Sequence, residues 1–491
     1  MNLSLISLEV CVLILGLLVL VADLWLPVER KKLLGYAAAG ALTFLLVINV
    51  GGWGKCTEMG LAFNNMFTQD QLSIFFDRFF LLAAILVLLM IAEFSDRLSA
   101  GVSEYYSITL FALLGMLFAS SANNFALLFV SLELITVSFY VLTSFQRARV
   151  ASLEAGVKYL IIGALSTAFT VFGIALVWGT SGKFNFTDLA AVAGQMGNNQ
   201  LFLFGLLFVM VGLGFKIGAF PFQVWVPDVY QGAPTPTTAF LAIGSKAAGF
   251  VLLLRVLFKA VPAITSQWAN VLIIISGITI LYGNLCAMRQ FNVKRLLGYS
   301  SIAHAGYLLL GVAAMAGAAK GGGNSTDGGA AILYYLTGYL FTVLAGFLVI
   351  TLVLRHLETE DISGLSGLGQ RSPLLAGTMT LAMVSLAGLP PLAGFFGKFL
   401  LLKSVIDLGP GNHGYYCLAF TALVGVVISI YYYFRVVNVI YWGESNDKSP
   451  VPMSWPARLA IYVCIVGMLW LGLVPGGLLT LARDGAGILG Y

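Results

Sequence analysis

Residues 215–236 read FKIGAFPFQVWVPDVYQGAPTP and residues 388–394 read GLPPLAG, and both stretches interrupt long apolar runs. Proline lacks a backbone N–H and its ring clashes with the preceding helical turn, so a helix should break at these prolines. The run around the second stretch covers 372–408. As one helix it would be roughly 55 Å long, which exceeds a hydrocarbon core of about 30 Å. The sequence therefore predicts two membrane helices that are broken within the bilayer.

Apolar runs of membrane-spanning length fill the rest of the chain. A spanning helix needs about 20 mostly apolar residues. Fourteen candidate spans lie at 4–25, 33–52, 78–95, 105–121, 123–143, 155–179, 201–220, 238–260, 268–287, 297–317, 329–354, 372–408, 414–441 and 456–481. Only 10% of the 491 residues are charged, against about 25% in a soluble domain. This composition excludes a soluble protein and predicts an all-α integral membrane protein of about 14 transmembrane helices.

The two broken helices suggest an internal repeat. They are the seventh and the twelfth spans, so equivalent positions lie five spans apart. Because five is odd, consecutive copies must insert in opposite orientations, and inverted repeats with discontinuous helices mark the ion path of many transporters. We expect helices 1–3 in residues 1–104, a first repeat of helices 4–8 in 105–260, a second, inverted repeat of helices 9–13 in 261–441, and a C-terminal helix 14 in 442–491.

Basic residues in the short loops predict the orientation, because cytoplasmic loops carry an excess of Lys and Arg. Loops after odd-numbered spans hold Arg30, Lys31, Lys32, Arg97, Arg147, Arg149, Arg289, Lys294, Arg295, Arg355, Arg371, Lys448 and Arg458. Loops and helix ends after even-numbered spans hold about seven or eight, including Lys55, Lys183, Arg255, Lys259 and Lys320. The odd loops are therefore expected in the cytoplasm, with both termini on the periplasmic side.

Several ionisable residues lie inside the apolar runs. They are Glu133, Lys158, Lys216, Lys246, His304 and Lys398. A charged side chain at the centre of a membrane helix costs about 2.5–3.5 kcal/mol, and four of them cost on the order of 10 kcal/mol. That cost is comparable to the net stability of a whole domain. A structural role alone rarely requires so much, so these residues are candidates for function.

Proton transfer is the chemistry that such residues suit best. A lysine desolvated in lipid releases its proton more readily, and a neighbouring carboxylate opposes that release. Glu133 and Lys216 are the candidate pair, and Ser300, His304 and Tyr307 follow at helical spacing on one face. The alternative for each charge is a buried ion pair or a snorkelling side chain, and it has most weight for Lys158, near a helix end. The alternative for Ser300 and Tyr307 is that they only bond helices together.

The sequence contains no motif for binding a redox cofactor or nucleic acid. The five cysteines, Cys11, Cys56, Cys286, Cys417 and Cys464, are scattered without a C-x-x-C pair, which argues against an iron–sulfur cluster, a zinc site or a disulfide framework. The three histidines are too few and too far apart for the paired ligands of a b-type haem. Basic residues mostly flank apolar runs, so nucleic-acid binding has no support. Any electron transfer is expected to belong to partner chains.

Three motifs carry a resemblance to a known family. The stretches WVPDVYQGAPTPTTAF (225–240), VKRLLGYSSIAHAGYLLLG (293–311) and GLPPLAGFFGKF (388–399) resemble the antiporter-like membrane subunits of respiratory complex I. The PDVYQGAPTP form is most similar to the subunit N branch of bacterial proton-pumping NADH:quinone oxidoreductases, which corresponds to mitochondrial subunit two. The resemblance runs from about residue 70 to about residue 440.

The resemblance implies a fourteen-helix fold with inverted five-helix repeats and a proton path through the residues that match Glu133, Lys216, Lys246 and Lys398. Glu133 would modulate Lys216, Lys246 would relay the proton toward the middle, and Lys398 would pass it to the outer side. Relatives often carry histidine where this chain has Gln223, which cannot titrate. A proton relay through that position is therefore in doubt, although a hydrogen-bonding role is not.

As a function, the resemblance implies proton translocation coupled to quinone reduction in a multi-subunit enzyme. No cofactor is expected on this chain, with flavin and iron–sulfur clusters on partner subunits. The expected partners are the other membrane-arm subunits, the lipid bilayer and, indirectly, quinone, in a bacterial inner membrane. One alternative is a stand-alone or Mrp-type cation/proton antiporter. Another is a structural subunit that only couples neighbouring pumps, and a thylakoid relative also fits.

Overall fold

The computed structural model describes residues 3–27, 30–52, 58–98, 101–321, 325–354, 360–444 and 449–489, without the side chains of residues 320, 321 and 325. Several residues named above lie outside this part of the chain. They are Lys55, Cys56, Arg355 and Lys448, together with the side chain of Lys320.

Thirteen helical segments in the described ranges are long and apolar enough to cross a membrane. Their main helices are α1 (Ser7–Ala22), α2 (Lys32–Gly51), α3 (Gln71–Phe94), α4 (Val102–Ser120), α5 (Phe125–Thr143), α6 (Val150–Ser181), α8 (Gln200–Ile217), α11 (Lys246–Arg255), α12 (Ala269–Ala287), α13 (Val293–Gly321), α14 (Ser325–Val353), α18 (Gly414–Trp442) and α19 (Trp455–Leu473). The broken run 372–408 forms α16 (Pro373–Ala387) and α17 (Ala393–Ile406). Counted as one crossing, this pair makes fourteen, and the predicted all-α membrane fold is confirmed.

The shorter elements connect or extend these helices. The span of α11 also contains α10 (Thr235–Phe240) and the π-helical turns η4 (Leu241–Ser245) and η5 (Val256–Ala260). The others are η1 (Leu3–Ile6), η3 (Ser95–Arg97), α7 (Phe186–Ala193), α9 (Trp225–Gly232), η6 (Pro262–Trp268), η8 (Ile362–Leu365), α15 (Leu368–Arg371) and α20 (Gly476–Gly487). A two-stranded antiparallel hairpin, β1 (Gly60–Ala62) and β2 (Phe67–Gln69), was not predicted from the sequence.

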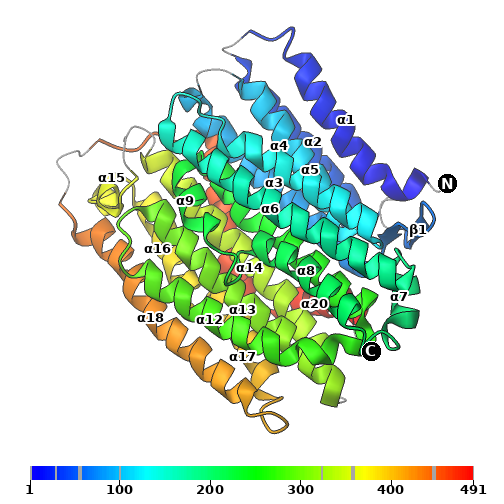
Figure 1. Ribbon diagram of the computed structural model, residues 1–491. Helices are drawn as coiled ribbons and strands as arrows, with labels where there is room; N and C mark the ends of the chain where they lie inside the picture. The colour runs from blue at the N-terminus through cyan, green and yellow to red at the C-terminus, as the bar shows by residue number, and fades with distance from the viewer. Residues whose placement is uncertain are drawn as a thin grey trace.

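The helices lie side by side in one bundle, with α1 along one edge and α18 along another (Figure 1). Burial separates inner from outer helices. In the apolar stretch of the span Thr235–Ala260, 100% of the residues are buried. The share of buried residues is 89% in the corresponding stretches of Val293–Ala319 and Thr326–Val353, but 33% in that of Ser4–Ala22. The inner spans are therefore enclosed by protein, where polar side chains can be shielded from lipid.

Both predicted helix breaks are present and are alike. The helix α8 ends at Ile217 and α16 ends at Ala387, and each is followed by a glycine with positive φ, 72° at Gly218 and 84° at Gly388. Glycine tolerates this left-handed conformation, in which its N–H can bond back to the carbonyls of the last helical turn. A cis X–Pro bond follows in each case, at Phe220–Pro221 and Pro390–Pro391.

Two isolated backbone bridges occupy similar positions in the first and second halves of the chain. Asn124, just before α5, pairs with Asn185, just after α6, and Asn292, just before α13, pairs with Asp361, after α14. The neighbouring α7 and α15 lie at opposite ends of the bundle (Figure 1). The two bridges give a register between the halves of the chain. Residues nine positions beyond Asn124 and Asn292 are Glu133 and Ser301.

The last predicted span, 456–481, differs from a single helix. The helix α19 ends at Leu473 and a separate helix, α20, begins at Gly476, with Pro475 between them. Proline cannot continue the hydrogen-bond ladder of α19. Hydropathy alone did not show this boundary, because both sides of the proline are apolar.

Substituting Gly388 tests the first residue of the second break. An added Cβ would lie 2.8 Å from Cδ of Lys398 at a φ of +84°. We expect Gly388→Ala to lower the free energy of unfolding by about 1–2 kcal/mol, because a side chain is strained in the left-handed region. Gly377→Ala is the control, since Gly377 in α16 has nothing within 4 Å of its ideal Cβ. Thermal unfolding of the purified variants measures both, and equal melting temperatures would contradict the strain argument.

Candidate functional site

The first buried lysine, Lys216, lies in the last turn of α8 beside the break and is 5% exposed. Its Nζ donates a hydrogen bond to the hydroxyl of Thr136 on α5. Glu133 lies one turn earlier on α5, and its Oε1 accepts a 2.7 Å hydrogen bond from Thr167 on α6. Glu133 and Lys216 form no ion pair with each other. The ammonium of Lys216 is therefore bonded to Thr136 and not to Glu133, the partner suggested by the sequence.

The second buried lysine, Lys246, begins α11 and is 4% exposed. Its Nζ donates to Ser301 on α13, at 2.5 Å to the carbonyl oxygen and also to the hydroxyl. The ring of Tyr339 on α14 lies 5.3 Å away, at cation–π distance. Ser301 also contacts Tyr230 of α9, with 3.0 Å between the hydroxyl oxygens. The helix α11 approaches α8 closely, since an ideal Cβ on Gly249 would lie 3.2 Å from Cβ of Lys216.

The third group is His304 on α13, which is 2% exposed. Its Nδ1 contacts the hydroxyl of Tyr335 on α14, and its Nε2 lies 3.1 Å from the hydroxyl of Tyr433 on α18. Tyr433 also hydrogen-bonds to Ser300. The predicted polar face of Ser300 and His304 is therefore a network that joins three helices. The ring of His304 lies 4.9 Å from that of Tyr339, which is next to Lys246, and 6.1 Å from that of Tyr307, which is next to Lys398.

The fourth group, Lys398, lies on α17 just beyond the second break and is 4% exposed. Its Nζ donates to two carbonyl oxygens at the end of α16, at 2.8 Å to Leu386 and 3.2 Å to Ala387. The last carbonyls of a helix carry a partial negative charge, so they can hold an ammonium without a carboxylate. The ring of Tyr307 lies 4.8 Å from the Nζ. The break thus supplies the partners of this lysine.

The structure does not bring Lys158 together with these groups. Its side chain is 42% exposed and forms ion pairs of 2.7 Å with both Glu154 and Asp228. Arg295 completes the set with a 2.6 Å contact to Asp228. This arrangement fits the ion-pair alternative for Lys158.

Gln223, where relatives often have histidine, lies in the first break and is 3% exposed. Its amide oxygen has no hydrogen-bond partner within the described part of the chain. An amide cannot exchange a proton near neutral pH, so at this position the chain offers a hydrogen-bonding group and not a titratable one.

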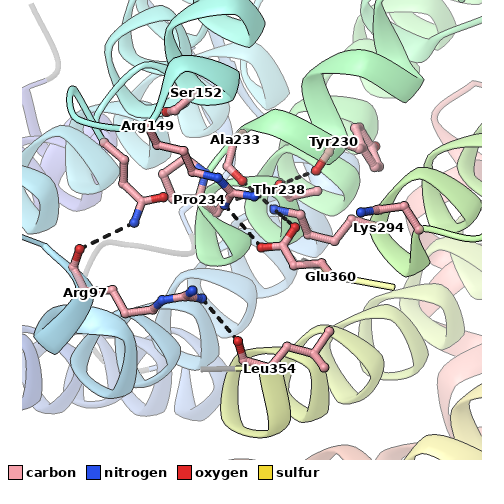
Figure 2. Close-up of polar contacts among 12 residues, drawn as sticks. Arg97, Arg149, Ser152, Tyr230, Ala233, Pro234, Thr238, Lys294, Leu354 and Glu360 are labelled. Carbon is pink, nitrogen blue, oxygen red and sulfur yellow. Dashed lines mark hydrogen bonds and ion pairs between the residues drawn. The ribbon is translucent and has the colours of Figure 1, made fainter. Parts of the chain in front are cut away.

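Two charge clusters were missed by the sequence analysis. In one, shown in Figure 2, Glu360 lies between Arg149 and Lys294. In the other, Arg255 of α11 binds Asp70, which caps α3. The basic residues of both clusters had been assigned to loops and helix ends. Lys294 and Arg255 are 0% and 1% exposed. The sequence signal is that Lys294 lies just before the apolar run 297–317 and Arg255 lies near the end of the run 238–260.

Taken together, the buried groups can bind and exchange protons. Their hydrogen bonds join α8 to α5, α11 to α13, and α17 to the end of α16. Among the described residues, no group of three or more His, Cys, Asp or Glu could hold a metal ion.

Comparison with known proteins places this geometry in a family. Residues 122–429 match a transmembrane family described as "NADH:quinone oxidoreductase/Mrp antiporter". The chain is 37% identical to the NADH-quinone oxidoreductase subunit N of Desulforamulus reducens over 486 residues, covering 99% of this chain and 98% of that protein. A chain of respiratory complex I from Thermus thermophilus, solved with bound aureothin, aligns with a TM-score of 0.79 and 31% identity over 97% of this chain and 99% of that one.

A chain of the Mrp complex from Dietzia aligns with a TM-score of 0.80 over 98% of each chain, but at 20% identity this likeness shows the fold alone. The family match covers well over half of the chain, and the relatives extend over nearly all of it. The protein therefore belongs to the NADH:quinone oxidoreductase/Mrp antiporter family of membrane subunits.

Proposed function

We propose that this chain is the proton-translocating membrane-arm subunit of an NADH:quinone oxidoreductase. The observation that carries the proposal is the set of three lysines, Lys216, Lys246 and Lys398. Each is no more than 5% exposed, and none is in contact with a carboxylate of the residues that the structure describes. Buried lysines without counter-ions are expensive in a membrane protein and mark proton or ion paths. The relatives that span nearly the whole chain are named as subunits of NADH-quinone oxidoreductase.

The role of each residue in proton transfer is proposed from the helices and side chains that it contacts. Glu133 modulates the proton affinity of Lys216 from one turn beyond Thr136, Lys246 relays the proton through Ser301, and His304 links Lys246 to Lys398. Lys398 passes the proton to the outer side. Lys158, with its two ion pairs, acts at the edge of this path. Redox energy enters in partner subunits, which hold the flavin and iron–sulfur clusters.

The proposal extends to organisation and location. Residues 105–260 and 261–441 form the two inverted repeats, between residues 1–104 and the C-terminal 442–491. The matching breaks and the matching pair of backbone bridges support this division. The chain lies in the bacterial inner membrane among other antiporter-like and small membrane-arm subunits, with both termini periplasmic. Quinone acts on it only indirectly.

Purification through a tag on this chain in mild detergent tests the proposal. We expect NADH-dependent quinone reduction to co-elute with flavin and iron–sulfur absorbance. Reduction supported by ferredoxin and not by NADH would instead indicate a photosynthetic-type complex. A chain that elutes alone and exchanges sodium or potassium for protons in liposomes would overturn the proposal in favour of a cation/proton antiporter.

A further inference from the structure

A buried carboxylate joins the two halves of the chain (Figure 2). Glu360 is 2% exposed and faces two cations, with Oε1 3.3 Å from Nη1 of Arg149 and Oε2 2.9 Å from Nζ of Lys294. Arg149 immediately precedes α6, and Lys294 lies in the first turn of α13. One side chain thus connects the start of a helix in the first half to the start of a helix in the second.

Lys294 also holds the turn between α9 and α10. Its Nζ donates a 2.7 Å hydrogen bond to the carbonyl oxygen of Ala233, the residue that caps the C-terminal end of α9. Lys294 is 0% exposed, so its ammonium depends on these protein oxygens. Glu360 supplies the only carboxylate in contact with it within the described ranges.

A second contact fixes the same segment to α13 nearer the middle of the helix. Tyr230 of α9 meets Ser301, the residue that receives Lys246. The carbonyl of Tyr230 also accepts a 3.2 Å hydrogen bond from Thr238 on α10. Lys294 and Ser301 are seven positions apart and therefore share one face of α13. The α9–α10 segment forms hydrogen bonds with both residues of this face, and one of them, Ser301, is the residue that receives Lys246.

We propose that Glu360 is a positioning residue for the Lys246 site. By holding Lys294 against Ala233, it fixes where Tyr230 meets Ser301 and so places the oxygens that receive the Lys246 ammonium. The inference rests on the proposed proton translocation, in which Lys246 carries a proton.

The charge state of Glu360 is consistent with this role. Burial by itself raises the pKa of this carboxyl, but Lys294 and Arg149 outweigh burial and hold the pKa below its usual range. Glu360 is therefore ionised at neutral pH. Neutralising Glu360 leaves the Lys294 ammonium buried without a counter-ion, and an uncompensated buried charge strongly destabilises the folded state.

The test compares Glu360→Gln with Asp361→Asn in the whole complex, measuring protons translocated per NADH oxidised in sealed vesicles. Asp361 is the matched control, because it is the adjacent carboxylate and its side chain caps no helix. We expect Glu360→Gln to lower translocation about tenfold, since a misplacement of about 1 Å at a reacting group costs up to roughly 100-fold. Glu360→Asp, which keeps the charge, should recover part of the loss, and Asp361→Asn should match the wild type.

A double variant separates positioning from stability. Glu360→Gln combined with Lys294→Met removes the unpaired buried cation, so the amount of assembled complex should return to the wild-type level. If Glu360 positions the Lys246 site, translocation per NADH stays low in this variant, because the link to Ala233 is still absent. Recovery of translocation together with assembly would mean that Glu360 only stabilises the fold, and would overturn the inference.

Lys246→Ala in the same assay distinguishes this inference from the function on which it rests. Normal translocation by Lys246→Ala would contradict the proposed proton path itself. Low translocation by Lys246→Ala with normal translocation by Glu360→Gln would overturn only the role of Glu360. Low translocation by both, and by the double variant, supports both proposals.

Discussion

Replacing Lys216 with alanine should remove most of the proton translocation of the assembled complex while the chain still inserts. Lys216 is the charged group at the end of α8, and it reaches across to Thr136 on the helix of Glu133. A positioned group that transfers protons contributes about 10²–10⁴-fold to a rate, so translocation per NADH should fall on the order of 100-fold. Proton uptake by inverted membrane vesicles, normalised to NADH oxidised, measures the loss.

The thermal stability of Lys216→Ala, unlike its proton translocation, should not fall. Removing a buried charge eliminates an insertion cost of about 2.5–3.5 kcal/mol, so Lys216→Ala should melt at or above the wild-type temperature. Lys398→Ala should behave alike, because in the described part of the chain its ammonium contacts helix-end carbonyls and the ring of Tyr307 and no carboxylate. Lys403→Ala on the same helix is the control, since that residue is exposed. If either Lys216→Ala or Lys398→Ala translocates protons at the wild-type level, the assigned path is wrong.

The parts of this molecule that could be predicted depend on local chemistry. A proline or a glycine acts on its own turn of helix, so the breaks at 218–221 and 388–391 follow from the sequence. Lys216, Lys246 and Lys398 stand out because each is a charge in an apolar run. The partners of these lysines could not be predicted, because they are backbone oxygens and hydroxyls on other helices, such as the carbonyls of Ser301 and Leu386.

The two charge clusters that the sequence did not predict also depend on contacts between residues far apart in the chain. Glu360 and Arg149 are 211 positions apart, and a single sequence contains no signal that joins them. Lys294 was placed in a loop because the apolar run begins at 297, whereas α13 begins four residues earlier at Val293. The hydrogen bonds of a helix continue past the end of its apolar stretch. Hydropathy therefore assigns buried charges at helix ends to the loops.

The stability of the chain should depend strongly on Asp70, outside the proton path. Arg255 is 1% exposed and makes hydrogen bonds of 3.0 and 2.8 Å with the two oxygens of Asp70. Removing one partner of a buried pair costs about 3–5 kcal/mol, so Asp70→Asn should lower the free energy of unfolding by about 3 kcal/mol. Asparagine caps a helix as well as aspartate does, so the α3 cap at Ser73 is preserved and the charge alone is tested.

Asp96→Asn provides the matched control. Asp96 pairs with Lys32, and both side chains are 42% exposed. An exposed ion pair contributes about 0–1 kcal/mol, because water screens it. Thermal or denaturant unfolding of both variants should therefore separate them by about 2 kcal/mol or more. Equal losses would mean that the buried guanidinium of Arg255 has found another partner.

The pH dependence of unfolding gives an independent check on Asp70. Burial by itself raises the pKa of Asp70, but the guanidinium of Arg255 outweighs burial and holds the pKa below its ordinary value. A carboxyl whose pKa is lower in the folded state than in the unfolded state stabilises the fold fully above the unfolded pKa, near 3.9, and loses this contribution as the pH falls through the folded pKa. The difference in melting temperature between wild type and Asp70→Asn should therefore be constant at neutral pH and shrink in acid. A difference that persists unchanged to the lowest measurable pH would contradict the ion-pair explanation, because the aspartate would then stabilise the fold without its charge.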